Sequence, residues 1–120
     1  MKLRHNQSFY RFMVSCARGA KGHETLYNST DNTYCIVGKA LSRVGVPQEK
    51  LDGENLPEHL AVKNHKKLWG FSKITSLWDE GKSKECLTYI RKRYKGRTVG
   101  DFINMLTRAG ILENEVTNIN

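Results

Sequence analysis

The sequence has no long apolar run. No stretch of it approaches the roughly 18 consecutive apolar residues of a membrane-spanning helix. The opening segment, Met1-Lys2-Leu3-Arg4-His5, is not followed by the apolar segment that a secretory signal peptide requires. We therefore expect neither a membrane span nor a signal peptide.

Cysteine is sparse as well. Cys16, Cys35 and Cys86 form an odd set without paired spacing, whereas a secreted disulfide framework usually has an even number of cysteines. The cysteines therefore favour a reducing, cytoplasmic location.

Metal-ligand patterns are missing. No Cys-x-x-Cys pair occurs, and the four histidines, His5, His23, His59 and His65, show no spacing typical of a metal site. The six-residue separation of His59 and His65 is only a weak hint of one. We expect no metal and no other cofactor.

Recognisable catalytic motifs are also absent. No glycine-rich loop of the phosphate-cradling kind is present. Cys35, near the polar edge of its predicted helix, is the most plausible nucleophile, but no base stands near it in sequence. Cys16 and Cys86 fall on apolar helix faces and are more simply small buried side chains. We therefore expect a protein that is not an enzyme, with chemistry at Cys35 or a histidine as the enzymatic alternative.

Positive charge is what the sequence has in excess. Lysine and arginine number 20 against 12 aspartate and glutamate, a formal net charge of +8. Residues 82–97 hold seven basic side chains and one acidic one, Glu85, and residues 1–23 hold five basic and no acidic ones. Residues 48–61 are acidic instead. Charge placed in this way bears on partners and solubility rather than on the fold.

The apolar pattern predicts a mainly α fold. Hydrophobic residues make up 38% of the 120 residues, enough for one small core. Apolar side chains recur at helical spacing in residues 7–20, 32–44, 73–79, 84–95 and 99–109. Residues 21–32 are expected to form a loop, 47–51 and 57–60 short helical turns, and 69–71 a short strand. We predict one compact domain of four to five helices in residues 1–112, a minor strand pair at most, and a loose tail at 113–120.

Capping residues mark the predicted helix ends. Thr98 with Asp101 three residues later resembles a capping box. Gly38 lies inside a predicted helix, where glycine costs about 1 kcal/mol relative to alanine, and this indicates that another backbone packs closely there. The other predicted N-caps are Asn6, Thr30 or Asp31, Ser72 and Ser83.

The strongest functional feature is the basic cluster at residues 91–97. On the helix predicted for residues 84–95, the apolar face consists of Cys86, Leu87, Ile90 and Tyr94. The other side carries Lys84, Arg91, Lys92 and Lys95, and Arg97 follows the helix. Such a face attracts phosphate groups. A charged face that only keeps the protein soluble is an equally good explanation.

A second basic cluster, Lys63, Lys66 and Lys67, would extend the first if both fold onto the same side. Trp69, Phe71 and Trp78 follow it and are candidates for stacking on bases. Such aromatic residues are more often part of the core. Because no helix-turn-helix or zinc-finger spacing is present, no base-specific reader can be identified.

Two segments resemble an uncharacterised family of small helical proteins found in bacteria and their phages. The family's Cys-x-x-Gly-x-Ala-Leu helix is matched by Cys35-Ile36-Val37-Gly38-Lys39-Ala40-Leu41, and its closing helix is similar to residues 98–110. The Asn-Asp pair expected before the closing helix is replaced by Lys95-Gly96-Arg97. The resemblance implies helical architecture and no particular activity. The compact, basic composition, rich in lysine and asparagine, also resembles that of early proteins of tailed phages.

Two functions fit these observations. The first is a non-catalytic protein that binds nucleic acid or another polyanion through the basic face, with Lys63, Lys66 and Lys67 as secondary contacts. The second is an inhibitor of a host enzyme or defence factor that docks on an acidic partner surface, anchored by an exposed aromatic residue such as Trp69 or Trp78.

Overall fold

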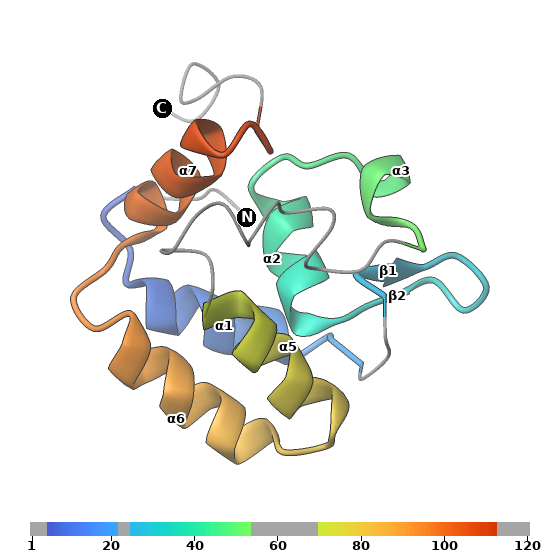
Figure 1. Ribbon diagram of the computed structural model, residues 1–120, viewed down its shortest axis with the longest axis horizontal. Coiled ribbons are helices and arrows are strands. Elements are labelled where there is room, and N and C mark those ends of the chain that lie inside the picture. The colour runs from blue at the N-terminus through green and yellow to red at the C-terminus, as the bar shows by residue number, and fades with distance from the viewer. Residues whose placement is uncertain (1–4, 22–24, 54–69, 113–120) are drawn as a thin grey trace.

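The computed structural model describes residues 5–21, 25–53 and 70–112. Within these ranges the chain forms six helices and one two-stranded antiparallel sheet, which confirms the mainly α prediction. In chain order the elements are α1 (Phe9–Ala17), β1 (Tyr27–Asn28), β2 (Thr33–Tyr34), α2 (Ile36–Arg43), α3 (Gln48–Leu51), α5 (Gly70–Asp79), α6 (Ser83–Arg93) and α7 (Val99–Arg108). Helices α1, α2, α5 and α6 pack against one another, while α7 contacts α1 (Figure 1).

The first helix begins later and ends earlier than its apolar pattern predicts. Ser8 rather than Asn6 caps α1, because its hydroxyl oxygen accepts a hydrogen bond from the Arg11 N–H at 3.3 Å. The helix ends at Ala17. Its buried face consists of Phe9, Phe12, Met13 and Cys16. The apolar pattern also predicts Ala17 and Ala20 on this face, but both are only half-buried.

The segment predicted as a loop contains a β-hairpin. Tyr27 pairs with Tyr34 and Asn28 with Thr33 across its two short strands. The two tyrosine rings lie 4.5 Å apart between centroids, and the Tyr27 hydroxyl donates to Asn32 Oδ1 at 2.7 Å. A strand pair therefore lies at residues 27–34, whereas residues 70 and 71 of the predicted strand are helical.

The predicted start of the second helix, residue 32, is wrong because the hairpin includes this residue. Asn32 has a φ of 56°, in the left-handed region, which is incompatible with a continuing right-handed helix. Helix α2 begins at Ile36 instead, and the Cys35 sulfur caps it by accepting from the Gly38 N–H at 3.3 Å. Neither Thr30 nor Asp31 is the cap.

Gly38 confirms the prediction of a close backbone approach. A Cβ atom at this position would collide with the carbonyl oxygen of Leu26 and would lie 2.7 Å from its carbonyl carbon. The residue before the hairpin thus passes directly over α2, and only glycine leaves room for it.

The strand predicted around residues 69–71 is wrong for the two residues that the structure describes. Gly70 and Phe71 form the first turn of α5, so Ser72 lies inside this helix and does not cap it. A Cβ atom on Gly70 would lie 2.6 Å from the Tyr94 hydroxyl oxygen. Glycine between two aromatic residues therefore reflects close packing against α6, not an extended backbone.

Helices α6 and α7 follow their predicted patterns closely. Helix α6 includes Ser83, and its N-cap residue Lys82 makes no side-chain capping bond. The Thr98–Asp101 capping box is confirmed, with both of its reciprocal hydrogen bonds present. The apolar pattern predicts Val99, Phe102, Ile103, Leu106 and Ala109 on one face of α7; the first four are buried and Ala109 is half-buried.

The core is centred on Phe9. Its ring centroid lies 5.0 Å from that of Phe102 and 5.2 Å from that of Tyr94, so α1 joins α7 and the end of α6. Phe12 and Phe71 complete the aromatic cluster, each 6.3 Å from Phe9.

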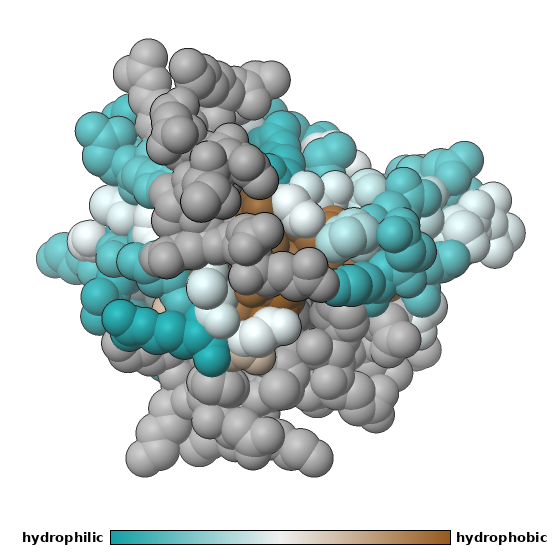
Figure 2. Space-filling view, turned by 90° about the horizontal axis from the view of Figure 1, so that it is seen from above, coloured by the Kyte–Doolittle hydropathy of each residue, from teal (hydrophilic) through white to brown (hydrophobic). Residues whose placement is uncertain are grey.

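On the face shown in Figure 2, hydrophilic side chains surround a small central area of hydrophobic ones. No helix among the described residues has the length and apolar character to cross a bilayer.

Candidate polyanion-binding surface

Helix α6 separates its apolar and basic residues onto different sides. Cys86, Ile90 and Tyr94 are buried and Leu87 is half-buried. The predicted contact residues, Lys84, Arg91, Lys92, Lys95 and Arg97, are all exposed. We call these five residues the basic face. Within the described part of the chain, none of the five forms an ion pair, whereas the nearby Lys82 is 3.3 Å from Glu80.

The two edges of α6 carry arginines that contact different helices. Arg91 lies 5.9 Å from the ring centroid of Tyr10, on the side of α1. Arg93 lies on the opposite edge, against the N-terminus of α5, and its guanidinium is 5.3 Å from the Tyr94 ring centroid. The basic surface therefore extends around α6 and is not confined to one stripe.

The turn between α6 and α7 is held firmly in place. Arg97 donates its N–H to the Tyr94 carbonyl at 3.0 Å, and its own carbonyl accepts from the Phe9 N–H at 2.9 Å. An isolated bridge between Ser8 and Thr98 ties the next residue to the same segment. The backbone of Arg97 is thus fixed between α1 and α7, which limits where its side chain can reach.

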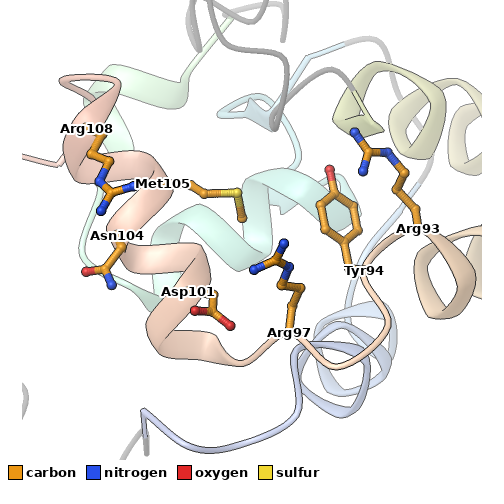
Figure 3. A pocket seen from close by; sticks show the side chains of 7 residues that line it. All are labelled: Arg93, Tyr94, Arg97, Asp101, Asn104, Met105 and Arg108. Carbon is orange, nitrogen blue, oxygen red and sulfur yellow. The ribbon is translucent and has the colours of Figure 1, made fainter.

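A pocket of about 260 Å³ opens between this turn and α7 (Figure 3). Three arginines from different positions line it: Arg93 at the end of α6, Arg97 in the turn and Arg108 in the last turn of α7. Its other lining residues are Tyr94, Asp101, Asn104 and Met105. We call these seven residues the arginine pocket.

The chemistry of the arginine pocket is that of a hydrogen-bond donor site. Burial raises the pKa of Tyr94 well above its ordinary value, and the Arg93 guanidinium opposes this shift only in part, so the phenol stays neutral. One oxygen of the Asp101 carboxylate accepts from the Thr98 N–H at 2.9 Å and is thereby committed to the capping box. The described lining residues include three arginines and one aspartate, a formal charge of two positive.

Sequence reasoning missed most of this pocket. Arg97 is one of the contacts predicted from the sequence, whereas Arg93, Asn104 and Arg108 are not among them. Asp101, Asn104, Met105 and Arg108 follow one another at i, i+3, i+4 and i+7, a spacing that places them on one face of α7. That stripe was visible in the sequence. Its meeting with Arg93 and Arg97 depends on how α6 and α7 are joined.

The second basic cluster, Lys63, Lys66 and Lys67, lies outside the described residues, as does Trp69. Trp78 is 8% exposed and belongs to the core. Phe71 is fully buried. Trp78 and Phe71 are therefore not available to stack on nucleic-acid bases, and neither is an exposed anchor for a protein partner.

The three cysteines are buried, and burial outweighs the effect of Arg43 beside Cys16 on the pKa of that thiol. All three are free and buried, including Cys35, which was predicted near a polar edge. Burial raises the pKa of Cys16 and of Cys35 to about 11 and that of Cys86 to about 12, so these thiols stay protonated at neutral pH. Among the described side chains, no group of three or more potential ligands is arranged to hold a metal ion.

No protein-family model, curated protein or solved structure matches this chain. The resemblance to small helical phage and bacterial proteins therefore stays a prediction. The candidate site rests on its own geometry and charge.

Proposed function

We propose that this protein is a non-catalytic, cytoplasmic nucleic-acid-binding protein that holds the sugar-phosphate backbone against its basic face. The observation that supports this proposal is the exposure of Lys84, Arg91, Lys92, Lys95 and Arg97 without an ion-pair partner in the described part of the chain. Cations that are not neutralised within the protein can replace the counterions of phosphate groups, and the released counterions drive binding.

Nucleic acid fits this surface better than an acidic protein partner does. A protein partner docked as predicted would need an exposed aromatic anchor near the centre of the interface. Trp78, the anchor predicted within the described residues, is in the core. Contacts to a phosphate backbone need no such anchor, only guanidinium and ammonium groups at suitable spacing. We therefore propose binding with little preference for base sequence.

The test is a salt titration of binding, measured by fluorescence anisotropy on mixed-sequence DNA and RNA fragments, single- and double-stranded. With about five phosphate contacts, the logarithm of the association constant should fall with the logarithm of salt concentration at a slope of about −3.5 on single strands. Fragments of unrelated sequence should bind with similar affinity. The absence of an anisotropy change with every fragment at low salt would contradict the proposal.

A further inference from the structure

The arginine pocket differs from the basic face in shape and in charge. The basic face consists of exposed side chains on α6 and on the turn after it, where a chain of phosphates can lie. The arginine pocket is concave and gathers Arg93, Arg97 and Arg108 around one volume (Figure 3). Arg97 belongs to both and connects them. A chain lying along the basic face would therefore arrive at the pocket.

Size restricts what the pocket can hold. Its volume of about 260 Å³ lies below the range of about 300–1,000 Å³ that is usual for sites enclosing a whole drug-sized ligand. It exceeds the volume of a phosphate group alone. A phosphate with the sugar next to it, at the end of a longer molecule, fits these limits.

Charge restricts the ligand further. A phosphate monoester near neutral pH carries about −1.5 to −2 charges and three acceptor oxygens, whereas a diester inside a nucleic acid chain carries one charge. The described lining residues carry a formal charge of two positive, and Arg97 and Arg108 form no ion pair in the described part of the chain. Guanidinium groups bind such oxygens in a bidentate manner. The Asn104 side chain, exposed at the same opening, offers a further donor.

From this geometry we infer that the arginine pocket binds the terminal phosphate monoester of a nucleic acid chain, at its 5′ or 3′ end. The inference rests on the proposed function, because the chain is delivered by the basic face. Arg97 and Arg108 contact the terminal phosphate from the two sides of the opening, and Arg93 is held over the Tyr94 ring. The protein then prefers phosphorylated ends over hydroxyl ends.

The experiment compares three fluorescent single-stranded oligonucleotides of one sequence, with a 5′-phosphate, a 3′-phosphate or hydroxyl groups at both ends. The ratio of dissociation constants, hydroxyl-ended over phosphate-ended, is measured at fixed salt. Hydrogen bonds to charged groups contribute about 1.5–3 kcal/mol, so one phosphorylated end should bind roughly tenfold more tightly. The oligonucleotide that shows this ratio identifies the end that is bound. Equal affinity for all three overturns the inference and leaves the proposed function standing, whereas binding of none overturns both.

Two variants locate the effect. Arg108→Gln should bring the ratio to about one, and Arg97→Gln is a second variant with the same expected change in the ratio. Arg18→Gln is the matched control, because Arg18 is also an exposed arginine at the C-terminal end of a helix and should keep the wild-type ratio. Thermal unfolding of each variant checks that it is folded. An Arg108→Gln and an Arg97→Gln protein that both keep the wild-type ratio would place the end preference elsewhere and overturn the inference.

Competition with a nucleoside monophosphate separates a chain end from a small ligand. The free nucleotide should compete for the phosphorylated oligonucleotide only at much higher concentration, because it lacks the contacts along the basic face. The nucleoside without phosphate should not compete. A free nucleotide that binds as tightly as the phosphorylated oligonucleotide would overturn the assignment to a nucleic acid end.

Discussion

Single residues in this protein are constrained mainly by how closely neighbouring segments approach. Gly38 and Gly70 lie in helices, where glycine is unfavourable, and each faces an atom of another segment that a Cβ would meet. Phe9 contacts the ring of Phe12 on its own helix, those of Phe71 on α5 and Phe102 on α7, and that of the α6 C-cap residue Tyr94. A glycine inside a predicted helix thus indicates that another segment packs closely against it, but does not indicate which segment.

Gly38→Ala should strongly destabilise the fold. The added methyl group would collide with the Leu26 carbonyl, and overpacking of this kind typically costs about 1–3 kcal/mol. The measurement is the free energy of unfolding in urea. Gly19→Ala is the control, since its Cβ would meet only the end of the Lys39 side chain at 3.9 Å, and it should change stability by less than about 0.5 kcal/mol. Similar losses for both variants would contradict the close approach of Leu26 to α2.

Ile90→Ala tests the orientation of α6 at the residue scale. Ile90 is fully buried, so truncating it should cost about 2–5 kcal/mol, enough to threaten a domain of this size. Chemical denaturation monitored by circular dichroism gives the value. A loss below about 1 kcal/mol would mean that Ile90 does not face the core.

At the scale of elements, helix α6 combines two tasks on one short segment. Its inner side, Cys86 and Ile90, packs into the core, and Tyr94 closes the helix against Gly70 of α5. Its outer side carries exposed charged side chains that do not pack into the core. Stability and binding should therefore respond to different substitutions within the same eleven residues.

The triple variant Arg91→Gln, Lys92→Gln, Lys95→Gln should stay folded and bind nucleic acid weakly. Exposed charges on a helix contribute little to stability, so the free energy of unfolding should change by less than about 1 kcal/mol. Removing three phosphate contacts should flatten the salt slope on single strands by about 2. Anisotropy across a range of salt concentrations measures both effects.

The outcomes of this variant separate the possible roles of the cluster. A triple variant that unfolds would show that these side chains support the core, against their exposure. One that is folded and binds like the wild type, with an unchanged salt slope, would return the cluster to a role in solubility alone. Thr88→Ala, on the same helix but without charge, is a control for changes in helix stability.

At the scale of the whole molecule, the three thiols report on the integrity of the core. They come from α1, from the cap of α2 and from α6, and all are buried. Burial is the main cause of their raised pKa values, about 11 for Cys16 and Cys35 and about 12 for Cys86. The folded protein therefore holds protons that the unfolded chain releases at lower pH.

Stability should accordingly fall in alkaline solution. A folded pKa raised above the ordinary value of 9.0 gives a stabilisation that is complete below pH 9 and is lost as pH rises toward 11–12. By pH 10 each thiol with a pKa raised by two units should cost roughly 1 kcal/mol. Urea midpoints from pH 7 to pH 10.5 measure the fall, and Cys86→Ala should show a shallower one. A midpoint that rises above pH 9 would contradict this prediction.

The sequence by itself determined the helices that carry long periodic stripes. Residues 84–95 and 99–109 predicted α6 and α7 with their buried faces, because an amphipathic helix needs only one apolar side and a place to end. The Thr98–Asp101 box was equally local, since its bonds join residues three apart. The exposure of the basic face followed from the same period.

Tertiary structure alone decided where short or unusual segments went. Two-residue strands have no period to recognise, and the hairpin at Tyr27–Asn28 and Thr33–Tyr34 exists through pairing between them. Gly70 became helical because Tyr94 packs against it. The arginine pocket depends in the same way on two backbone hydrogen bonds, from the Phe9 N–H to the Arg97 carbonyl and from the Val99 N–H to the Gln7 carbonyl. These bonds fix the turn before α7 and bring Arg93, Arg97 and Arg108 to one opening. Local sequence sets which face of a helix is polar, but only long-range contacts set which polar faces meet.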